Sequence, residues 1–402
     1  MKFHILGVGA IGGLIAHNLR RVLPAEFSVT LIHKSFRDQI RLQRKGAITI
    51  ERSGIEHASK GYDHEIFHES ILPSSVLPQK TVSSAAETST GPIDSLFVAL
   101  KAHHTTSALQ ALASRLTPRS TVVLLQNGMG IYENLLADVF RNPTQRPHFI
   151  LTSNSHGAFA TDFYHIVHAG VGSIEFGIAP DPQGRDFEAG LHDHNLLPRH
   201  RRLRLTDISL PGDPQSERYN NLRSTVAALL LLDKLGTSWQ PFSALQLAMR
   251  RKLTVNAVIN PLTALVDCRN GDLFESEPAR ELLTQICDEA SSVFMAQMAA
   301  ETESWLNDLQ ADGVDTSTVQ PPAFPEALRS MALQTEVLRV AAITRQNISS
   351  TLGDVRRGRT TEIDFLNGYL VNLGREHGVN TPVNSVLANL IRLKSAVPLN
   401  LV

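Results

Sequence analysis

The sequence predicts an α/β protein of two domains, in which a half of alternating strands and helices precedes a mostly α-helical half. Three observations support this prediction. The chain has 402 residues, which is long for one domain and comfortable for two. Short apolar runs alternate with helical patterns through the first 150 residues, and helical spacing prevails from Leu222 onward. The pattern changes near residues 239–241, so we expect domains at 1–240 and 241–402.

Four short apolar runs in the first half are typical of buried strands, and they lie at 2–6, 27–32, 95–100 and 121–125. Helical patterns lie between them, from Ile11 to Leu23, through Ile40 and Leu42, and around 105–116. Strands that alternate with helices in this way form parallel sheets covered on both faces. We therefore expect a parallel sheet in the N-terminal domain.

The rest of the chain is predicted to contain five helices, at 222–235, 243–260, 278–310, 326–348 and 360–377. Three other stretches have little periodicity and carry many Pro, Gly, Ser, His or charged residues, at 51–91, 179–221 and 312–325. We expect all three to be loops, the first two being insertions in the N-terminal domain. We assign them no chemistry.

The charge balance and composition exclude several classes of partner. Lys and Arg number 38 and Asp and Glu 39, for a net charge of −1, so no basic excess favours nucleic acid or an anionic membrane. The longest apolar run, 226–232, is far too short to span a bilayer. Cys268 and Cys287 have neither disulfide-framework nor metal-ligand spacing, and we expect no metal. Because a strand begins by Phe3 with no signal segment before it, we expect a cytoplasmic protein, with a mitochondrial location still open.

A glycine-rich turn follows the first predicted strand. Gly7, Gly9 and Gly12 fit the pattern G-x-G-x-x-G, with Ala10 and Ile11 opening the next helix. The first glycine permits the tight turn, the second lets a pyrophosphate approach the backbone, and the third allows close helix–strand packing. Free N–H groups at the helix start favour an anion. A glycine turn with no ligand is the alternative, but the strand–turn–helix context predicts a Rossmann-type dinucleotide-binding domain.

The end of the second predicted strand indicates which dinucleotide is bound. NAD sites usually place Asp or Glu there, to hold the ribose 2′-hydroxyl. This chain instead has Lys34 and Arg37, and the nearest carboxylate, Asp38, comes later. Two cations at this position favour the 2′-phosphate of NADP(H), although solvated surface cations are an alternative. We therefore expect NADPH/NADP+ as the cofactor.

Three polar side chains share one face of a predicted helix in the C-terminal half. Lys252, Asn256 and Asn260 are spaced at i, i+4 and i+8 within an otherwise apolar segment. An unpaired buried amide costs about 1–3 kcal/mol, so a polar group should face these side chains. Bonds to other groups in the core are one solution, and a polar ligand is the other.

Further segments join the glycine turn as parts of one larger pattern: FVALK at 97–101, LLQNGMG at 124–130, RKLTVNAVINPLTA at 251–264, SSTLGD at 349–354 and RTTEIDFLNG at 359–368. Together, and in this order, these motifs resemble the ketopantoate reductase (2-dehydropantoate 2-reductase) family, whose members use NADPH in pantothenate and coenzyme A biosynthesis. The resemblance spans both halves, and the loops at 51–91, 179–221 and 312–325 lie outside it.

The resemblance implies a role for each matched residue. Lys252 is expected to be the general acid that protonates the ketone oxygen as hydride arrives, and Glu362 to orient that lysine and bind the substrate hydroxyl. The other matched positions are expected to bind substrate or cofactor. Asn256, Asn260 and Ser350 match substrate-binding residues, Lys101 matches a cofactor-proximal lysine, and Asn127 matches an asparagine beside both nicotinamide ribose and substrate.

Some alternatives to these roles stay open. Glu362 can be an ordinary helix-surface glutamate, and Ser349 and Ser350 can simply cap a helix. Lys34 stands where the family often has arginine, so discrimination against NADH is expected to be weaker.

The resemblance as a whole implies NADPH-dependent reduction of ketopantoate to (R)-pantoate, and this is the function that we expect.

Two other functions remain alternatives. One is a related reductase of another branched 2-oxo acid, since the motifs indicate the shared chemistry and not the side chains that line the substrate pocket. The other is an NADP(H)-sensing protein without turnover, which has no need for Lys252, Asn256 and Glu362 together. We expect a small-molecule 2-oxo acid as the partner and leave a homodimer open.

Overall fold

The computed structural model describes residues 1–67, 91–210 and 212–397. The chain forms two compact units. The first comprises Met1–Gln126 and Tyr132–Leu245, and the second comprises Asn127–Ile131 and the chain from Gln246 onward. The short segment 127–131 thus belongs to the second, helical unit although it lies in the N-terminal half of the sequence.

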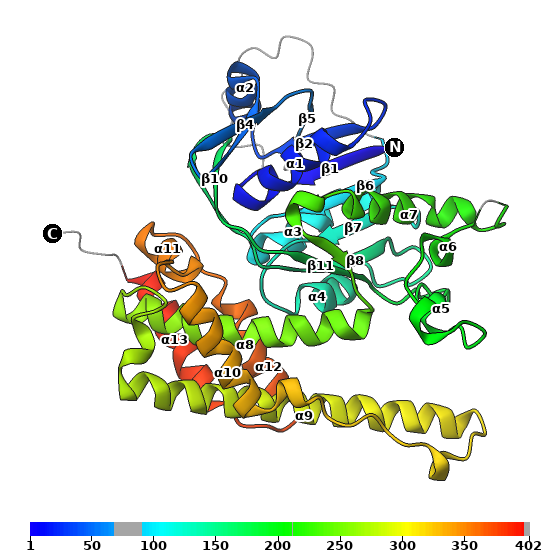
Figure 1. The fold of residues 1–402 in the computed structure, drawn as a ribbon, viewed down its shortest axis with the longest axis vertical. Coiled ribbons are helices and arrows are strands. Elements are labelled where there is room, and N and C mark those ends of the chain that lie inside the picture. Colours follow the sequence, from blue (N-terminus) through cyan, green and yellow to red (C-terminus); the bar gives the residue numbers. More distant parts are fainter. Residues whose placement is uncertain (68–90, 211, 398–402) are drawn as a thin grey trace, which may run out of the picture. The chain divides into compact units, whose positions relative to one another are not determined.

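The first unit contains an eight-stranded sheet with the order β12-β11-β8-β7-β6-β1-β2-β5 (Figure 1). In chain order its strands are β1 (Lys2–Leu6), β2 (Ser28–His33), β5 (Asp63–Ile66), β6 (Ser95–Val98), β7 (Thr121–Leu124), β8 (His148–Asn154), β11 (Ile174–Ile178) and β12 (Thr237–Trp239). All neighbouring pairs are parallel except β8 and β11. The fold class is therefore confirmed, and the four predicted strands lie side by side at the centre of the sheet as β7, β6, β1 and β2.

The segment expected to be a loop at 51–91 carries strands in its described part, so that expectation was wrong there. Besides β5, it holds most of the hairpin of β3 (Ile48–Arg52) and β4 (Ile55–Ser59), and residues 68–90 lie outside the described residues. Ser53 and Gly54 join the two strands, both with positive φ, which is the geometry of a two-residue type I′ turn. β4 is exposed except at Ser59, so it lacks the apolar alternation by which strands are predicted.

β3 and β4 form a second sheet of order β4-β3-β10-β9, completed by β9 (Gly157–Asp162) and β10 (His165–Gly170). Helix α1 (Ala10–Val22) contacts strands of both sheets. At Gly13 a Cβ would lie 2.3 Å from Cδ1 of Ile166 on β10, so a larger residue there would displace the end of the Ile166 side chain. The second sheet thereby covers the helix that follows the glycine turn.

The remaining helices of the first unit are α2 (Phe36–Lys45), α3 (Ala102–Leu112), α4 (Ile131–Asp138), α5 (Ala189–His192), α6 (Leu205–Ile208) and α7 (Ser216–Leu230). The stretch 179–221 is irregular apart from α5, α6, one 3₁₀ turn and the start of α7. A buried bond from the Tyr219 hydroxyl to the Asp181 carboxylate, 2.6 Å long, ties this stretch to α7.

The second unit consists of helices α8 (Phe242–Val266), α9 (Glu277–Ala311), α10 (Ser330–Ile343), α11 (Ser350–Arg356), α12 (Asn367–Glu376) and α13 (Pro382–Ala396), of which α8 begins in the first unit. α8 continues through Pro261 to Val266, beyond the predicted end at residue 260. The predicted helix 360–377 is instead a 3₁₀ turn at Ile363–Phe365 followed by α12.

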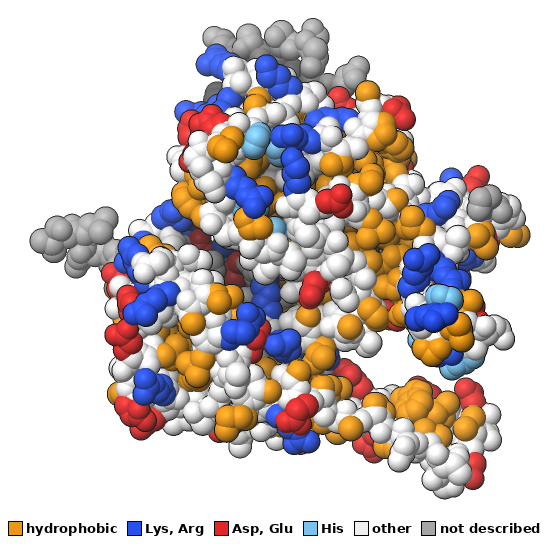
Figure 2. Space-filling model, in the orientation of Figure 1, with side chains coloured by type: hydrophobic (Ala, Val, Ile, Leu, Met, Phe, Trp, Pro, Cys, Tyr) orange, Lys and Arg blue, Asp and Glu red, His pale blue; other side chains and the backbone are white. Residues whose placement is uncertain are grey.

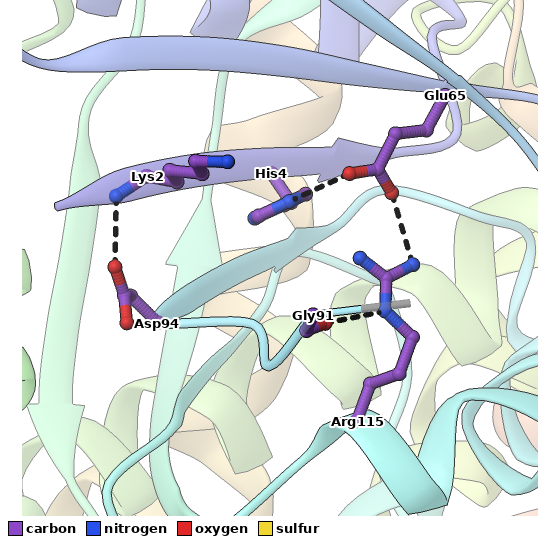
Figure 3. A network of polar contacts seen from close by, with 6 residues as sticks. All are labelled: Lys2, His4, Glu65, Gly91, Asp94 and Arg115. Carbon is purple, nitrogen blue, oxygen red and sulfur yellow. Dashed lines mark hydrogen bonds and ion pairs between the residues drawn. The ribbon is translucent and has the colours of Figure 1, made fainter. Parts of the chain in front are cut away.

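A buried polar network links strands of the large sheet (Figure 3). Glu65 on β5 accepts from Arg115 at 2.9 Å and pairs with His4 on β1 at 3.3 Å, across the intervening β2. Nearby, the Lys2 amide donates to Asp94 at 2.9 Å, and Arg115 Nε donates to the Gly91 carbonyl at 2.9 Å.

On the face shown in Figure 2, acidic and basic side chains are mixed over the surface. No helix within the described ranges has the length and apolar composition needed to cross a bilayer.

Candidate functional site

The glycine turn joins the carboxyl end of β1 to the first turn of α1. Gly7 has φ +94°, and a Cβ there would lie 2.8 Å from the backbone of Ala99 and Leu100, so the position requires glycine. At Gly12 a Cβ would lie 2.0 Å from the Gly7 carbonyl oxygen. The turn is thus tightly packed against its own helix and against the segment that follows β6.

Gly9 differs from its neighbours because a Cβ there would meet nothing within 4 Å. It is exposed and forms the N-cap of α1 without a side-chain cap, and the first turn, which begins with Ala10 and Ile11, has no acidic residue. Open space beside uncapped N–H groups and a positive helix end is the environment that a pyrophosphate needs. The residues present therefore fit a dinucleotide.

Lys34 directly follows β2 and Arg37 lies in the first turn of α2, and both side chains are exposed. Ser35, between them, caps α2 by accepting from the Asp38 amide at 3.3 Å. Asp38 in turn accepts from the Ser35 hydroxyl at 2.9 Å and pairs with Arg41 at 3.9 Å. The nearest carboxylate is thus engaged within α2, and the two exposed cations stand beside the strand end.

Lys101 follows β6 and is the N-cap of α3. β6, β1 and β2 are adjacent parallel strands, and Ile5 pairs with both Phe97 and Leu31. Because the carboxyl ends of parallel strands meet at one edge of a sheet, the glycine turn, Lys34 and Lys101 gather at the same edge. Ligands of open α/β sheets bind at this edge.

In the second unit, Lys252 donates from Nζ to Oδ1 of Asn127 at 2.9 Å. The partners are 125 residues apart in sequence, and segment 127–131 brings them together. This segment is fixed by a bond from the Met129 amide to the Phe365 carbonyl, 3.1 Å long. At Gly128, with φ +85°, a Cβ would lie 2.4 Å from the same carbonyl, so a glycine is needed for this approach.

Burial lowers the pKa of Lys252 to about 8, from a usual value of 10.5, while the charge of Glu362 acts to raise it. The lysine side chain is half-buried, and Glu362 is only 7% exposed just before the 3₁₀ turn Ile363–Phe365. Glu362 is therefore not a surface glutamate. The structure brings Lys252, Asn127 and Glu362 together, and a lysine with this pKa can release a proton near neutral pH.

The other predicted substrate residues lie near the same helix. Asn256 is half-buried and Asn260 is buried one turn further along α8. Asn260 Nδ2 lies 3.5 Å from Oγ of Ser350. Ser349 caps α11, since its hydroxyl accepts from the Leu352 amide at 3.1 Å and from Thr263 at 2.8 Å. Of the two serines, Ser349 is thus the cap, and Ser350 is exposed.

One group with metal-ligand spacing occurs among the residues that the structure describes, outside these sites: Glu51, Glu56 and His165 on the second sheet. His165 pairs with Glu51 at 3.2 Å and with Glu56 at 3.9 Å. His165 and Glu51 thus lie within hydrogen-bond distance of each other, and we assign the cluster no metal.

Comparison with known proteins finds two family models along the chain. The model described as ketopantoate reductase PanE/ApbA matches residues 3–181, and its C-terminal counterpart matches residues 244–395. The 2-dehydropantoate 2-reductase of Escherichia coli O157:H7 is 30% identical over 303 residues, covering 75% of each chain. The chain belongs to the ketopantoate reductase family. It is therefore an enzyme of an oxidoreductase family.

Two further comparisons extend over nearly the whole chain. The probable 2-dehydropantoate 2-reductase of Schizosaccharomyces pombe is 26% identical over 402 residues, covering 99% of this chain and 97% of that one. A solved structure of D-mandelate dehydrogenase with NADH and anilino(oxo)acetate is 17% identical, with a TM-score of 0.64 and 98% of each chain covered. The second comparison shows the shared fold.

Sequence reasoning missed two residues that support the site. Gly13 lies where α1 packs against Ile166 of the second sheet, and its signal was the second of two consecutive glycines, Gly12 and Gly13. Asn367, buried at the start of α12, donates to a backbone carbonyl of α8. Asn367 lies in the motif RTTEIDFLNG, but the motif alone does not show which group this side chain binds.

Proposed function

We propose that this protein reduces 2-dehydropantoate to (R)-pantoate with NADPH, a step of pantothenate and coenzyme A biosynthesis. The observation that carries the proposal is the bond from Lys252 Nζ to Asn127, 2.9 Å long, beside the buried Glu362. The substrate is supported by the names of the relatives from Escherichia coli and Schizosaccharomyces pombe. The preference for NADPH is supported by two exposed cations, Lys34 directly after β2 and Arg37 in the first turn of α2.

The cofactor would be held by residues of the first unit. The backbone of Gly7, Gly9 and the first turn of α1 would face its pyrophosphate, and Lys34 and Arg37 its 2′-phosphate. Lys101 lies at the same sheet edge. When bound, NADPH supplies the hydride for C2 of the 2-oxo acid.

Residues of the second unit supply the proton and hold the substrate. Lys252 Nζ donates its proton to the ketone oxygen, which becomes the hydroxyl of the product, and the amine is left neutral. Before transfer, the positive charge of Lys252 attracts the negative charge developing on that oxygen. Glu362 stabilises the charged lysine and accepts from the substrate hydroxyl. Asn256, Asn260 and Ser350 donate hydrogen bonds to the polar groups of the substrate.

The test is NADPH oxidation by purified protein, followed by absorbance, with ketopantoate and a panel of other branched and aromatic 2-oxo acids. NADH replaces NADPH in a parallel series. The proposal expects the highest kcat/KM for ketopantoate with NADPH. A higher value for another 2-oxo acid would keep the chemistry and replace the substrate, and tight NADPH binding without any turnover would favour the sensor.

A homodimer stays an open alternative, and a cytoplasmic location stays a prediction, with a mitochondrial one still open. Light scattering on the purified protein measures its mass in solution, and a mass of one chain, 44.1 kDa, would contradict a homodimer. Microscopy of a tagged protein in its native cell tests the second.

A further inference from the structure

A proline interrupts the hydrogen bonding of α8 within the candidate site. Pro261 lies inside the helix and directly follows Asn260. Proline has no backbone N–H, so the carbonyl of Ala257, four residues earlier, loses its ordinary helical partner. Ala257 is fully buried, and a buried carbonyl without a partner is strongly unfavourable. Another donor must therefore reach Ala257.

Asn367, at the start of α12, is that donor. Its Nδ2 donates to the Ala257 carbonyl at 2.9 Å and to Oδ1 of Asn384 at 2.9 Å. Both hydrogens of the side-chain amide are thus used, and Asn367 and Asn384 are 0% exposed. The bond joins two positions 110 residues apart, across α8 and α12.

The direction of this chain of bonds is fixed by a carboxylate. Glu289, on α9, accepts from Nδ2 of Asn384 at 2.7 Å and from the amides of Val383 and Asn384, at 2.8 and 3.0 Å. An ionised carboxylate only accepts, so Asn384 must turn its NH2 group to Glu289 and its oxygen to Asn367. Asn367 must then present its own NH2 group to Ala257.

We infer that Asn367 is a positioning residue that holds α8 at the Pro261 break and so fixes the direction of the two substrate asparagines. Asn256 immediately precedes the carbonyl that Asn367 binds, and Asn260 immediately precedes the proline. The inference deepens the proposed function and rests on it, because it takes Asn256 and Asn260 as the residues that bind the 2-oxo acid.

The test is a cycle of three variants, Asn367→Ala, Pro261→Ala and the double variant. Alanine at 261 restores a backbone N–H that can donate to Ala257 in the ordinary helical bond. In the natural background, Asn367→Ala should raise KM for the 2-oxo acid about tenfold, the effect of one lost hydrogen bond, and change kcat far less. In the Pro261→Ala background, the same substitution should raise KM by less than about threefold.

Controls separate positioning from general loss of structure. Asn372→Ala removes an exposed asparagine from the same helix and should leave KM unchanged. The dissociation constant for NADPH should stay nearly constant in all variants, since the residues assigned to its pyrophosphate and 2′-phosphate lie in the other unit. An equal rise of KM in both backgrounds would overturn the inference, as would a lower melting temperature with an unchanged KM. If Asn367→Ala alone does not fold, an active double variant supports the inference and an unfolded one overturns it.

Hydrogen–deuterium exchange gives a readout that needs no activity. Peptides covering 253–266 should exchange faster in Asn367→Ala than in the natural protein, and the double variant should match Pro261→Ala. If the natural protein reduces no 2-oxo acid, the proposed function fails, while exchange still decides whether Asn367 holds α8. Unchanged exchange in Asn367→Ala would contradict the positioning role whatever the activity.

Discussion

Lys252 has two properties that a proton donor needs, namely a partner that aims it and a pKa near the working pH. Asn127 aims the ammonium group by accepting at 2.9 Å. Burial lowers its pKa to about 8, and Glu362 prevents a larger fall. A lysine in water, with a pKa of about 10.4, holds its proton too tightly to be an efficient acid at neutral pH.

Replacing this lysine should separate the contribution of its positive charge from that of its transferable proton. Lys252→Ala should lower kcat by about 10²–10⁴-fold, the usual contribution of a general acid, with the NADPH dissociation constant unchanged. Lys252→Arg keeps a positive charge but holds its proton at any working pH, so it should recover little of the rate. Steady-state kinetics and NADPH fluorescence titration measure both quantities. Substantial turnover in Lys252→Ala would remove this residue as the acid.

Lys34 provides a test of cofactor choice at the residue scale. Lys34→Asp should lower kcat/KM for NADPH, because a carboxylate repels the 2′-phosphate and accepts from a 2′-hydroxyl. The ratio of kcat/KM for NADH to kcat/KM for NADPH should rise by at least about tenfold. Arg37→Ala tests the second exposed cation. If the ratio changes in Arg37→Ala and not in Lys34→Asp, the arginine is the phosphate ligand.

At the scale of elements, the two serines at the start of α11 have different environments. Ser349→Ala removes the helix cap and should destabilise the fold by about 1 kcal/mol, measured by denaturant unfolding. Ser350→Ala should leave stability nearly unchanged and raise KM for the 2-oxo acid. The opposite pattern, with stability lost at Ser350 and KM raised only at Ser349, would exchange their assignments.

Glu65 makes the attachment of β5 to the large sheet sensitive to acid (Figure 3). Burial acts to raise its pKa, but hydrogen bonds and charge from His4 and Arg115 outweigh burial and lower the pKa to about 2. A depressed pKa stabilises the fold above the unfolded value of about 4.3, and this contribution is lost as pH falls toward 2. The shift corresponds to about 3 kcal/mol.

Unfolding by urea between pH 6 and pH 2.5 measures this contribution. Glu65→Gln should be less stable than the natural protein at pH 6, and the difference should shrink as pH falls below about 4.5. Glu56→Gln, at an exposed glutamate of the second sheet, is the control and should leave the profile unchanged. A difference that stays constant over the whole range would show that Glu65 acts through packing alone.

At the scale of the whole molecule, the parts predicted from sequence are those that local patterns determine. The central strands were predicted from short runs of buried apolar residues, and Lys252, Asn256 and Asn260 from their spacing on one helix face. The hairpin of β3 and β4 in the second sheet was missed because β4 is exposed. The local signal for this hairpin was the turn at Ser53 and Gly54. The bond between Asn127 and Lys252 joins segments 125 residues apart, and no sequence pattern predicted it.

The role of Lys252 as a proton donor tuned by Glu362 is tested most directly by the pH dependence of kcat/KM for ketopantoate reduction. This dependence is compared between the natural protein and Glu362→Gln. This ratio reports groups of the free enzyme. In the natural protein it should be constant at low pH and fall above about 8, as Lys252 loses its proton. Without the charge of Glu362, the fall should begin at lower pH. A profile that stays flat to pH 9.5, or a fall that begins at the same pH in both proteins, would contradict Lys252 as a proton donor tuned by Glu362.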